Sequence, residues 1–190
     1  ALPLAVAFTF LAYTLTGILG GSEFLPDGAI ATQLMIWSIP IGWINSLTQY
    51  VLIALDLQRR ITRAFMLAVS FNIIANLIFV PIYGYRAAAI VTILSEAMLL
   101  IPFALLLAGA VGAIPWVKLL WKAAAAAAAM AIILYLGWPI QPFIALVVGS
   151  AAYLLLLLLL RPLDGDEWTR LTPLLPGRFR TPPPDPVPTV

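Results

Sequence analysis

The chain has 190 residues, of which 63% are apolar and 9% are charged, and its mean hydropathy is +1.06. A soluble domain carries about 45–50% apolar and about 25% charged residues, so these proportions exclude a water-soluble globule. The net charge of +2 comes without any basic run interleaved with aromatics, so we expect no nucleic-acid partner. The chain has no cysteine and no histidine, which excludes thiol nucleophiles, Ser-His-Asp catalysis and Cys or His metal sites. We therefore expect no enzymatic activity, no metal and no cofactor.

Six apolar blocks follow one another along the chain. Each is about as long as a helix must be to cross a hydrocarbon layer of ~30 Å. The runs are continuous, whereas barrel strands alternate apolar and polar residues, so helices are favoured. The sequence predicts an all-α integral membrane protein with one transmembrane domain over residues 1–160. Its six helices are expected at about 2–19, 30–55, 64–80, 87–108, 116–136 and 142–160.

Prolines are expected to end or bend several of these helices. Pro81 and Gly84 should stop the third block. Pro40 and Pro102 lie inside the second and fourth blocks and should kink them, which membrane helices tolerate because neighbouring groups re-satisfy the freed carbonyls. Residues 161–190 differ sharply, since they are rich in charged residues and proline. We expect this last segment to be a polar, largely disordered cytoplasmic tail.

Basic residues alternate from one connection to the next. Arginines lie between the second and third blocks and in the tail, lysines lie between the fourth and fifth blocks, and only Arg86 lies on the other side. Because cytoplasmic loops carry an excess of Lys and Arg, both ends of the six-helix domain are predicted to be cytoplasmic. The chain begins with Ala1 and enters an apolar stretch directly, without the basic region of a signal peptide. We therefore expect a piece of a longer membrane protein.

Glu96 is the carboxylate that lies deepest within a predicted span. It follows Gly84 by about 18 Å along a helix, which places it near the bilayer midplane. A charge at that depth costs at least ~2.5–3.5 kcal/mol, so we expect Glu96 to be neutral or paired and to face the bundle or a watery cavity. Two interpretations stay open: an acid that couples transport to a proton or ion, or a hydrogen-bonded packing residue beside Ser95.

Amide side chains occur at helical spacing in two of the predicted spans. Asn45 and Gln49 share one face of the second helix, and Asn72 and Asn76 share one face of the third. Amides in lipid need hydrogen-bond partners. They either join helices to one another or line a hydrophilic transport cavity. Together with Glu96, these four residues are the candidate intramembrane, transport-related positions.

Residues 20–96 carry the motifs of a known family. The segment 20–29 reads GGSEFLPDGA, the helix that follows ends in LIALDLQRR, and residues 71–96 read FNIIANLIFVPIYGYRAAAIVTILSE. This pattern of an Asn-rich helix, a Pro-x-Tyr-Gly turn, a small-residue helix start and a later glutamate resembles the C-terminal part of the lipid-linked oligosaccharide flippases. These polysaccharide-biosynthesis membrane proteins belong to the multidrug/oligosaccharidyl-lipid/polysaccharide exporter superfamily. Arg86 departs from the pattern, since it replaces the usual small residue.

The resemblance implies a transporter fragment that flips or exports a lipid-linked oligosaccharide or polysaccharide precursor across the bacterial inner membrane by alternating access. It makes this chain roughly the last six helices of an exporter-type helical bundle. The implied partners are the bilayer, the N-terminal half of the same transporter and the lipid-linked glycan. Two alternatives remain: a cation-coupled drug or metabolite antiporter of the same superfamily, and a non-transporting structural module of a glycan-assembly complex. No substrate-binding residue is carried over from the family.

Overall fold

The computed structural model describes residues 1–160, and all regular structure in this range is helical. The short 3-10 helix η1 (Ser22–Phe24) lies between the first two α-helices. The α-helices are α1 (Leu2–Leu19), α2 (Asp27–Met35), α3 (Ser38–Ala54), α4 (Gln58–Tyr83), α5 (Tyr85–Val111), α6 (Trp116–Gly137) and α7 (Pro142–Leu159). The predicted all-α fold is therefore confirmed for the described range, while the predicted tail at 161–190 lies outside it.

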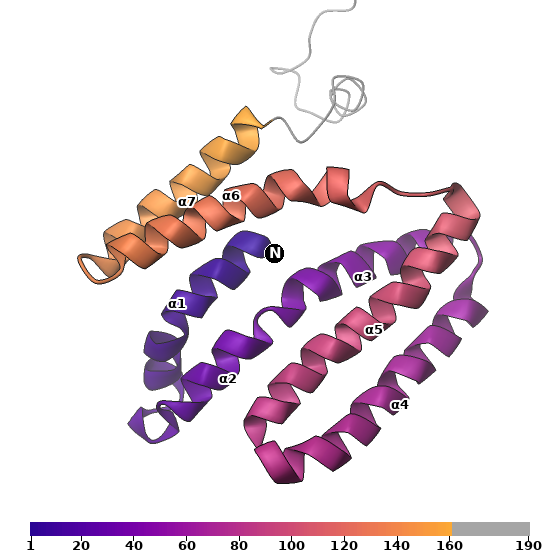
Figure 1. The fold of residues 1–190 in the computed structure, drawn as a ribbon, viewed down its shortest axis with the longest axis horizontal. Coiled ribbons are helices and arrows are strands. Elements are labelled where there is room, and N and C mark those ends of the chain that lie inside the picture. The colour runs from indigo at the N-terminus through magenta and orange to yellow at the C-terminus, as the bar shows by residue number, and fades with distance from the viewer. Residues whose placement is uncertain (161–190) are drawn as a thin grey trace, which may run out of the picture.

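Five of the described helices, α1 and α4 to α7, are long and apolar enough to cross a membrane. The prediction of one continuous helix over 30–55 is wrong. That block is divided into α2 and α3, which lie end to end and are separated at Ile36 and Trp37 (Figure 1). α2, with 9 residues, is too short to cross a bilayer by itself, and α2 and α3 together cover the length of one span.

Pro40 explains this break. A proline lacks an N–H group, and its ring clashes with the carbonyl four residues earlier in a helix; here that carbonyl belongs to Ile36. The Ile36 carbonyl instead accepts a hydrogen bond from the N–H of Ile39 at 3.2 Å. The hydroxyl of Ser38 donates to the carbonyl of Met35 at 2.7 Å. The expected kink is thus a complete interruption whose polar groups are satisfied locally.

The expected bounds of the third and fourth helices are also wrong. α4 already begins at Gln58 and continues through Pro81, and α5 extends beyond the expected 87–108 at both ends and runs without a break through Pro102. At its N-terminal end each helix continues into polar residues that hydropathy does not mark. At its C-terminal end each helix continues through the residue expected to stop it, Pro81 in α4 and Gly109 in α5. Gly84 does separate α4 from α5, because its φ of 62° is a conformation that glycine adopts without steric cost.

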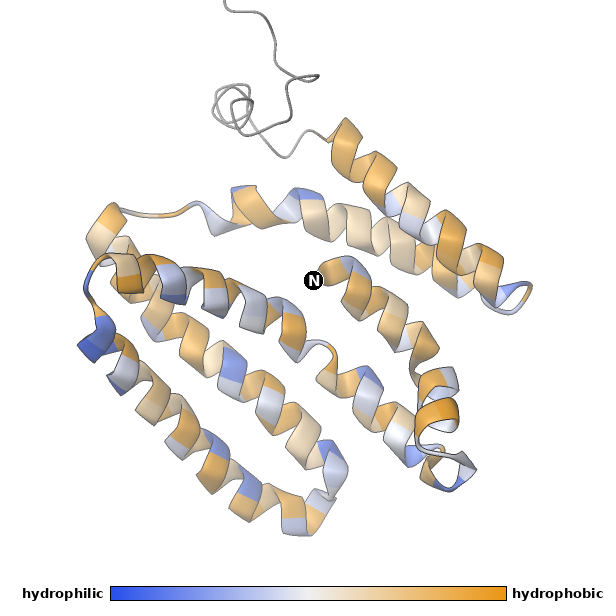
Figure 2. Cartoon of the chain, turned by 180° about the vertical axis from the view of Figure 1, so that it is seen from behind, coloured by the Kyte–Doolittle hydropathy of each residue, from blue (hydrophilic) through white to orange (hydrophobic). Residues whose placement is uncertain are grey.

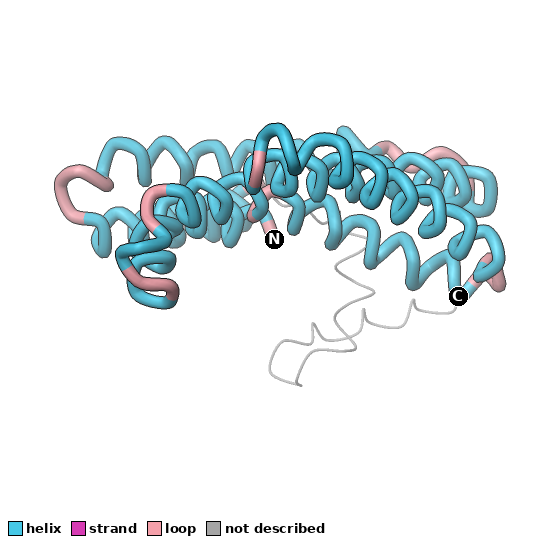
Figure 3. Tube along the Cα trace, turned by 90° about the horizontal axis from the view of Figure 1, so that it is seen from below, coloured by secondary structure: helices cyan, strands magenta, loops and turns pink. Residues whose placement is uncertain are grey.

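The helices form one shallow layer. Across it they follow one another as α7, α6, α1, then α2 and α3 end to end, then α5 and α4 (Figure 1). Seen from the side, the layer is thin relative to its width (Figure 3). Successive passes run in opposite directions, so their connections gather at two opposite edges. One edge holds residues 55–57 and 112–115, and the other holds residues 20–26, Gly84 and residues 138–141.

Two apolar clusters lie within this layer. The first joins α1, α6 and α7 through side chains that include Val6, Met130 and Leu134. The second joins α3, α4 and α5 around the fully buried Leu52 and Phe103. Most helices also leave large apolar side chains exposed, and Figure 2 shows that α7 is hydrophobic along nearly its whole length. Such surfaces are suited to hydrocarbon or to another helix bundle.

Candidate functional site

Glu96 lies near the middle of α5 and is paired with Asn45 of α3. The side-chain amide of Asn45 donates from Nδ2 to the Glu96 carboxylate Oε2 at 2.8 Å and to the Glu96 backbone carbonyl at 2.9 Å. One amide group therefore holds both the carboxylate and the backbone of the opposite helix. This contact joins two helices across 51 positions of sequence.

Gly42, one helical turn before Asn45, gives the carboxylate its space. A Cβ atom built at Gly42 would lie 3.5 Å from Oε2 and 3.7 Å from Oε1 of Glu96. A side chain longer than alanine at this position would therefore have to displace the carboxylate. The nearby hydroxyl of Ser46 donates to the Gly42 carbonyl at 2.9 Å and not to Glu96. Within the described residues, Asn45 therefore provides the side-chain hydrogen bond that the Glu96 carboxylate accepts.

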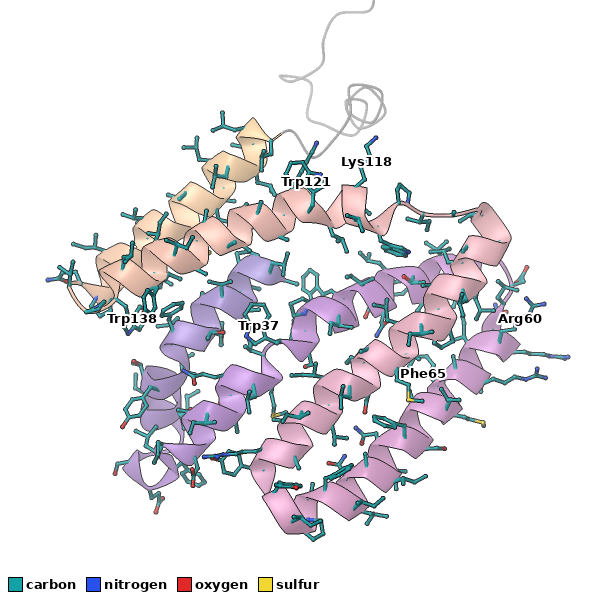
Figure 4. All side chains as sticks on the ribbon, in the orientation of Figure 1. Trp37, Arg60, Phe65, Lys118, Trp121 and Trp138 are labelled. Atoms are coloured by element: carbon teal, nitrogen blue, oxygen red, sulfur yellow. The ribbon has the colours of Figure 1, made fainter. Side chains whose placement is uncertain are left out.

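The pair borders a groove of about 360 Å³ between α3 and α5. Its polar lining comes from both helices, and Trp43, Phe65 and Leu99 are among its apolar lining residues. A second groove of about 220 Å³ lies on the α4 side of α5 and also borders Glu96. Phe65 lines both grooves, and its side chain lies between α4 and α5 (Figure 4). The polar residues of the larger groove are Ser38, Asn45, Ser46, Gln49 and Glu96.

Asn45 also carries an unpaired acceptor. The residue is only 3% exposed, and its Oδ1 atom has no hydrogen-bond partner in the described part of the chain. Leaving a buried polar atom unpaired costs about 1–3 kcal/mol, and such atoms are uncommon in native structures. Because this oxygen is buried, a donor or a cation in the groove beside Glu96 could reach it only after a neighbouring side chain moved.

Asn72 and Asn76 form a separate network between α4 and α5. Asn72 donates from Nδ2 to the hydroxyl of Ser95 at 2.8 Å, and that hydroxyl donates to the Val91 carbonyl at 2.7 Å. Asn76 donates to Oδ1 of Asn72 at 3.1 Å and to its backbone carbonyl at 2.9 Å. These amides therefore satisfy one another and a neighbouring helix, which favours the interpretation of helix-to-helix hydrogen bonding for both residues.

The five candidate residues thus have different roles in the structure. Asn45 and Glu96 form the central pair, while Asn72 and Asn76 connect α4 to α5 beside it. Gln49 lines the larger groove, and its side chain makes no hydrogen bond within residues 1–160. Gly42 is not among the residues predicted from sequence, although it precedes Asn45 by three residues and therefore lies on the same helical face.

The chemistry available at the site is that of one carboxylate among neutral polar groups. Within the described residues no group of three or more acidic, histidine or cysteine side chains is placed to hold a metal ion. The arrangement can bind a proton, a monovalent cation or a hydrogen-bonding group. No family model, no curated protein and no solved structure matches this chain.

Proposed function

We propose that this chain is the C-terminal part of an inner-membrane transporter that flips or exports a lipid-linked oligosaccharide or polysaccharide precursor by alternating access. The observation that carries the proposal is the Asn45–Glu96 pair, which borders a polar groove midway along apolar helices. Ionisable residues within membrane segments are costly, and they commonly mark substrate or ion paths. The motifs in residues 71–96, which resemble those of the flippases, suggest the substrate class.

The distribution of charge supports a cytoplasmic position for both ends of the domain. Of the six lysines and arginines within residues 1–160, five lie at the edge that contains the α3–α4 and α5–α6 connections. The side chains of Arg60 and Lys118 project outward there (Figure 4). The opposite edge has Arg86 together with Glu23 and Asp27. Through the positive-inside rule, this distribution supports a cytoplasmic position for the basic edge.

The shape of the layer supports a missing partner bundle. Many large apolar side chains remain exposed on the described helices, and the groove beside Glu96 is open. Alternating access requires a second bundle against which this one can rock. The N-terminal half of the same transporter would cover part of this surface, and lipid would cover the rest.

The Asn45–Glu96 pair also supports a second candidate function, a cation-coupled drug or metabolite antiporter. The carboxylate of Glu96 and the unpaired Oδ1 of Asn45 are oxygen ligands, which hard cations prefer. In this case the same groove would hold the coupling ion.

A reconstituted transport assay tests these functions. The full-length transporter is placed in liposomes with a lipid-linked oligosaccharide that carries a fluorescent group, and a membrane-impermeant reductant then bleaches the outer leaflet. We expect the reductant to bleach more than the outer-leaflet fraction of the fluorescence only when the protein is present, because flipping then brings inner-leaflet lipid to the outer leaflet. Transport of a soluble cationic substrate under a sodium or proton gradient, without any flipping, would favour the antiporter. Neither activity would favour the non-transporting structural module.

The variant Glu96→Gln separates charge from packing in the same assay. Its amide oxygen can still accept the hydrogen bond from Asn45, so this contact is kept, but the carboxyl group that could exchange a proton or bind a cation is lost. We expect the variant to lose flipping, whereas the matched control Glu23→Gln, at an exposed edge, keeps it. Normal flipping by Glu96→Gln would show that Glu96 is a packing residue.

Cysteine labelling tests the orientation, because the native chain has no cysteine. Ser22→Cys and Asp56→Cys place single thiols at exposed positions on opposite edges. An impermeant maleimide added to intact cells, with the outer membrane made permeable, should label position 22 and should reach position 56 only after the inner membrane is opened. The reverse pattern would contradict the proposed topology.

A further inference from the structure

A groove of about 540 Å³ lies between α4 and α5, close to the turn at Gly84. It is distinct from the grooves that border Glu96. Its walls are almost entirely apolar, and Arg86 is the one charged residue among them. Residues that line it include Phe71, Phe79 and Tyr83 of α4 and Arg86, Ile90 and Leu94 of α5.

The dimensions of this groove fit a hydrocarbon chain. From Phe71 to Tyr83 it follows α4 for about 18 Å, which is close to half of a hydrocarbon core of ~30 Å. The groove therefore runs from the interior of the layer to its edge, over about the depth of one leaflet. The buried small residues Ala75 and Ala87 are also part of its lining. A long apolar groove of this depth suits an acyl chain better than a compact polar ligand.

Arg86 lies at the outer end of the groove, and only one of its N–H groups makes a hydrogen bond within the described residues. Its Nε donates to the hydroxyl of Tyr85 at 3.2 Å, and its guanidinium carbon lies 5.8 Å from the centre of the Tyr85 ring. The Tyr85 hydroxyl in turn donates to Oδ1 of Asp27 at 2.7 Å, so the Asp27 carboxylate also lies close enough to attract Arg86. The terminal amino groups of Arg86 make no hydrogen bond within residues 1–160. An anchored guanidinium with a free edge is suited to a phosphate.

We propose that this groove binds one anionic membrane phospholipid, with an acyl chain between α4 and α5 and the phosphate on Arg86. Charge complementarity at the outer end and apolar lining over the depth of a leaflet together carry the assignment. The inference rests on the membrane insertion that the proposed function includes, but it does not depend on which substrate is transported. Arg86 is also the position at which the chain departs from the flippase pattern.

Photo-crosslinking in a bilayer tests this site. The full chain is reconstituted in bilayers of equal phosphatidylcholine and phosphatidylglycerol, in which one lipid at a time carries a diazirine in its acyl chain. Crosslinked peptides are then identified by mass spectrometry. We expect phosphatidylglycerol to label the segment that contains Ile90 and Leu94 more strongly than phosphatidylcholine does. In Arg86→Gln, the ratio of phosphatidylglycerol labelling to phosphatidylcholine labelling should fall about fivefold. This is the change in affinity expected when one basic side chain near anionic headgroups is lost.

Two further variants distinguish a built site from a general attraction of charge. Lys118→Gln removes a positive charge at the opposite edge and should leave labelling near Ile90 unchanged. Ile90→Trp replaces a half-exposed lining residue and should reduce labelling by both lipids, because the indole fills the groove. Labelling near Leu105, beside a separate groove lined by Arg60 and Arg63, serves as an internal reference and should not respond to Arg86→Gln.

Several outcomes would overturn the proposal. These are unchanged phosphatidylglycerol labelling in Arg86→Gln, equal losses in Arg86→Gln and Lys118→Gln, or full labelling in Ile90→Trp. Displacement of the lipid by inorganic phosphate would also overturn it, because the acyl chain would then contribute nothing.

An unchanged thermal unfolding midpoint in detergent confirms that each variant is folded. A chain that stays monomeric in buffer without detergent would contradict membrane insertion, a failure that is distinguishable from loss of lipid selectivity.

Discussion

The two sides of the helix layer are joined by different contacts. On one side, α6 and α7 approach closely because Gly137 lies against Ala145 and Gly149 lies against Met130 and Leu134. On the other side, α5 is tied to α3 and to α4 by side-chain hydrogen bonds. Lipid supplies no hydrophobic force between helices, so either close packing or polar contacts must hold them together.

Under the proposed function, the difference separates a packed scaffold from the side on which transport is proposed. On the α6–α7 side, small-residue packing brings the helices together, and Tyr153 is the polar side chain among the buried members of its cluster. The α3–α5 side instead contains Glu96, a half-buried carboxylate beside an open groove, and the unpaired oxygen of Asn45. A sequence selected for stability alone has no need of such groups. The costly polar groups therefore mark the side on which transport is proposed.

Gly149→Leu should give the largest effect and would break the packed side. A Cβ at Gly149 would already lie 3.4 Å from Leu134 Cγ and 3.5 Å from Met130 Cγ, so the rest of a leucine would push α7 away from α6. We expect a loss of about 1–3 kcal/mol, typical of an overpacked core, measured as a lower unfolding midpoint in detergent. Val148→Leu, on the exposed neighbouring position, is the matched control. Equal stability of the two variants would contradict close packing at Gly149.

Asn45→Leu should give the next largest effect and tests the polar side. It leaves the Glu96 carboxylate without its donor, so we expect a loss of about 1–2 kcal/mol of stability. Combining it with Glu96→Leu in a double-mutant cycle should give a coupling energy near the upper end of the range for membrane hydrogen bonds, about 1.7 kcal/mol. Gln49→Leu, which removes an amide without a side-chain hydrogen bond, should show no coupling to position 96. Coupling of equal size at both positions would mean that polarity in general, and not this contact, stabilises the layer.

Asn72→Ala paired with Ser95→Ala should give the smallest effect and would sharpen the contrast between the two polar contacts. Both partners are neutral, so the expected coupling energy is about 0.6 kcal/mol, the average for hydrogen bonds within membrane proteins. Flipping of the lipid-linked sugar by the full-length protein should be unaffected. Loss of flipping at normal abundance would extend the functional site from α3 and α5 to α4.

The sequence predicted much of the fold because hydropathy follows the apolar core of each helix. α1 lies where it was expected, and α6 and α7 differ from expectation by one residue at most. The prediction at 30–55 is wrong because continuous hydropathy does not reveal a backbone interruption. Pro40 predicts a kink from sequence, whereas in the structure the helix is interrupted and the Ile36 carbonyl accepts its hydrogen bond from Ile39. The predicted ranges of α4 and α5 are too short for two reasons. A helix continues where its polarity changes, as at Arg59 and Arg60, and Pro81 and Gly109 do not end the helices that contain them.

The candidate site was predictable only in part. Helical spacing correctly grouped Asn72 with Asn76, which are now hydrogen-bonded to each other. It could not pair Asn45 with Glu96, because their contact depends on α3 lying beside α5, and nothing in a single sequence specifies which helices are neighbours in a layer. The space at Gly42 depends on the same neighbourhood, so it was missed for the same reason.

The interruption at Ile36 and Trp37 has a mechanical consequence. It divides one crossing into two arms. α2 is fastened to α1 by the hydrogen bond from Gln33 to the Thr9 carbonyl at 3.0 Å and to α5 by the hydrogen bond from Tyr85 to Asp27, and α3 is fastened to α5 through Asn45. A joint thus lies within this crossing, and both of its arms contact α5. Ser38, the first residue beyond that joint, also lines the groove. A change of angle between the arms would widen or narrow the groove at that end while leaving the Asn45–Glu96 contact intact.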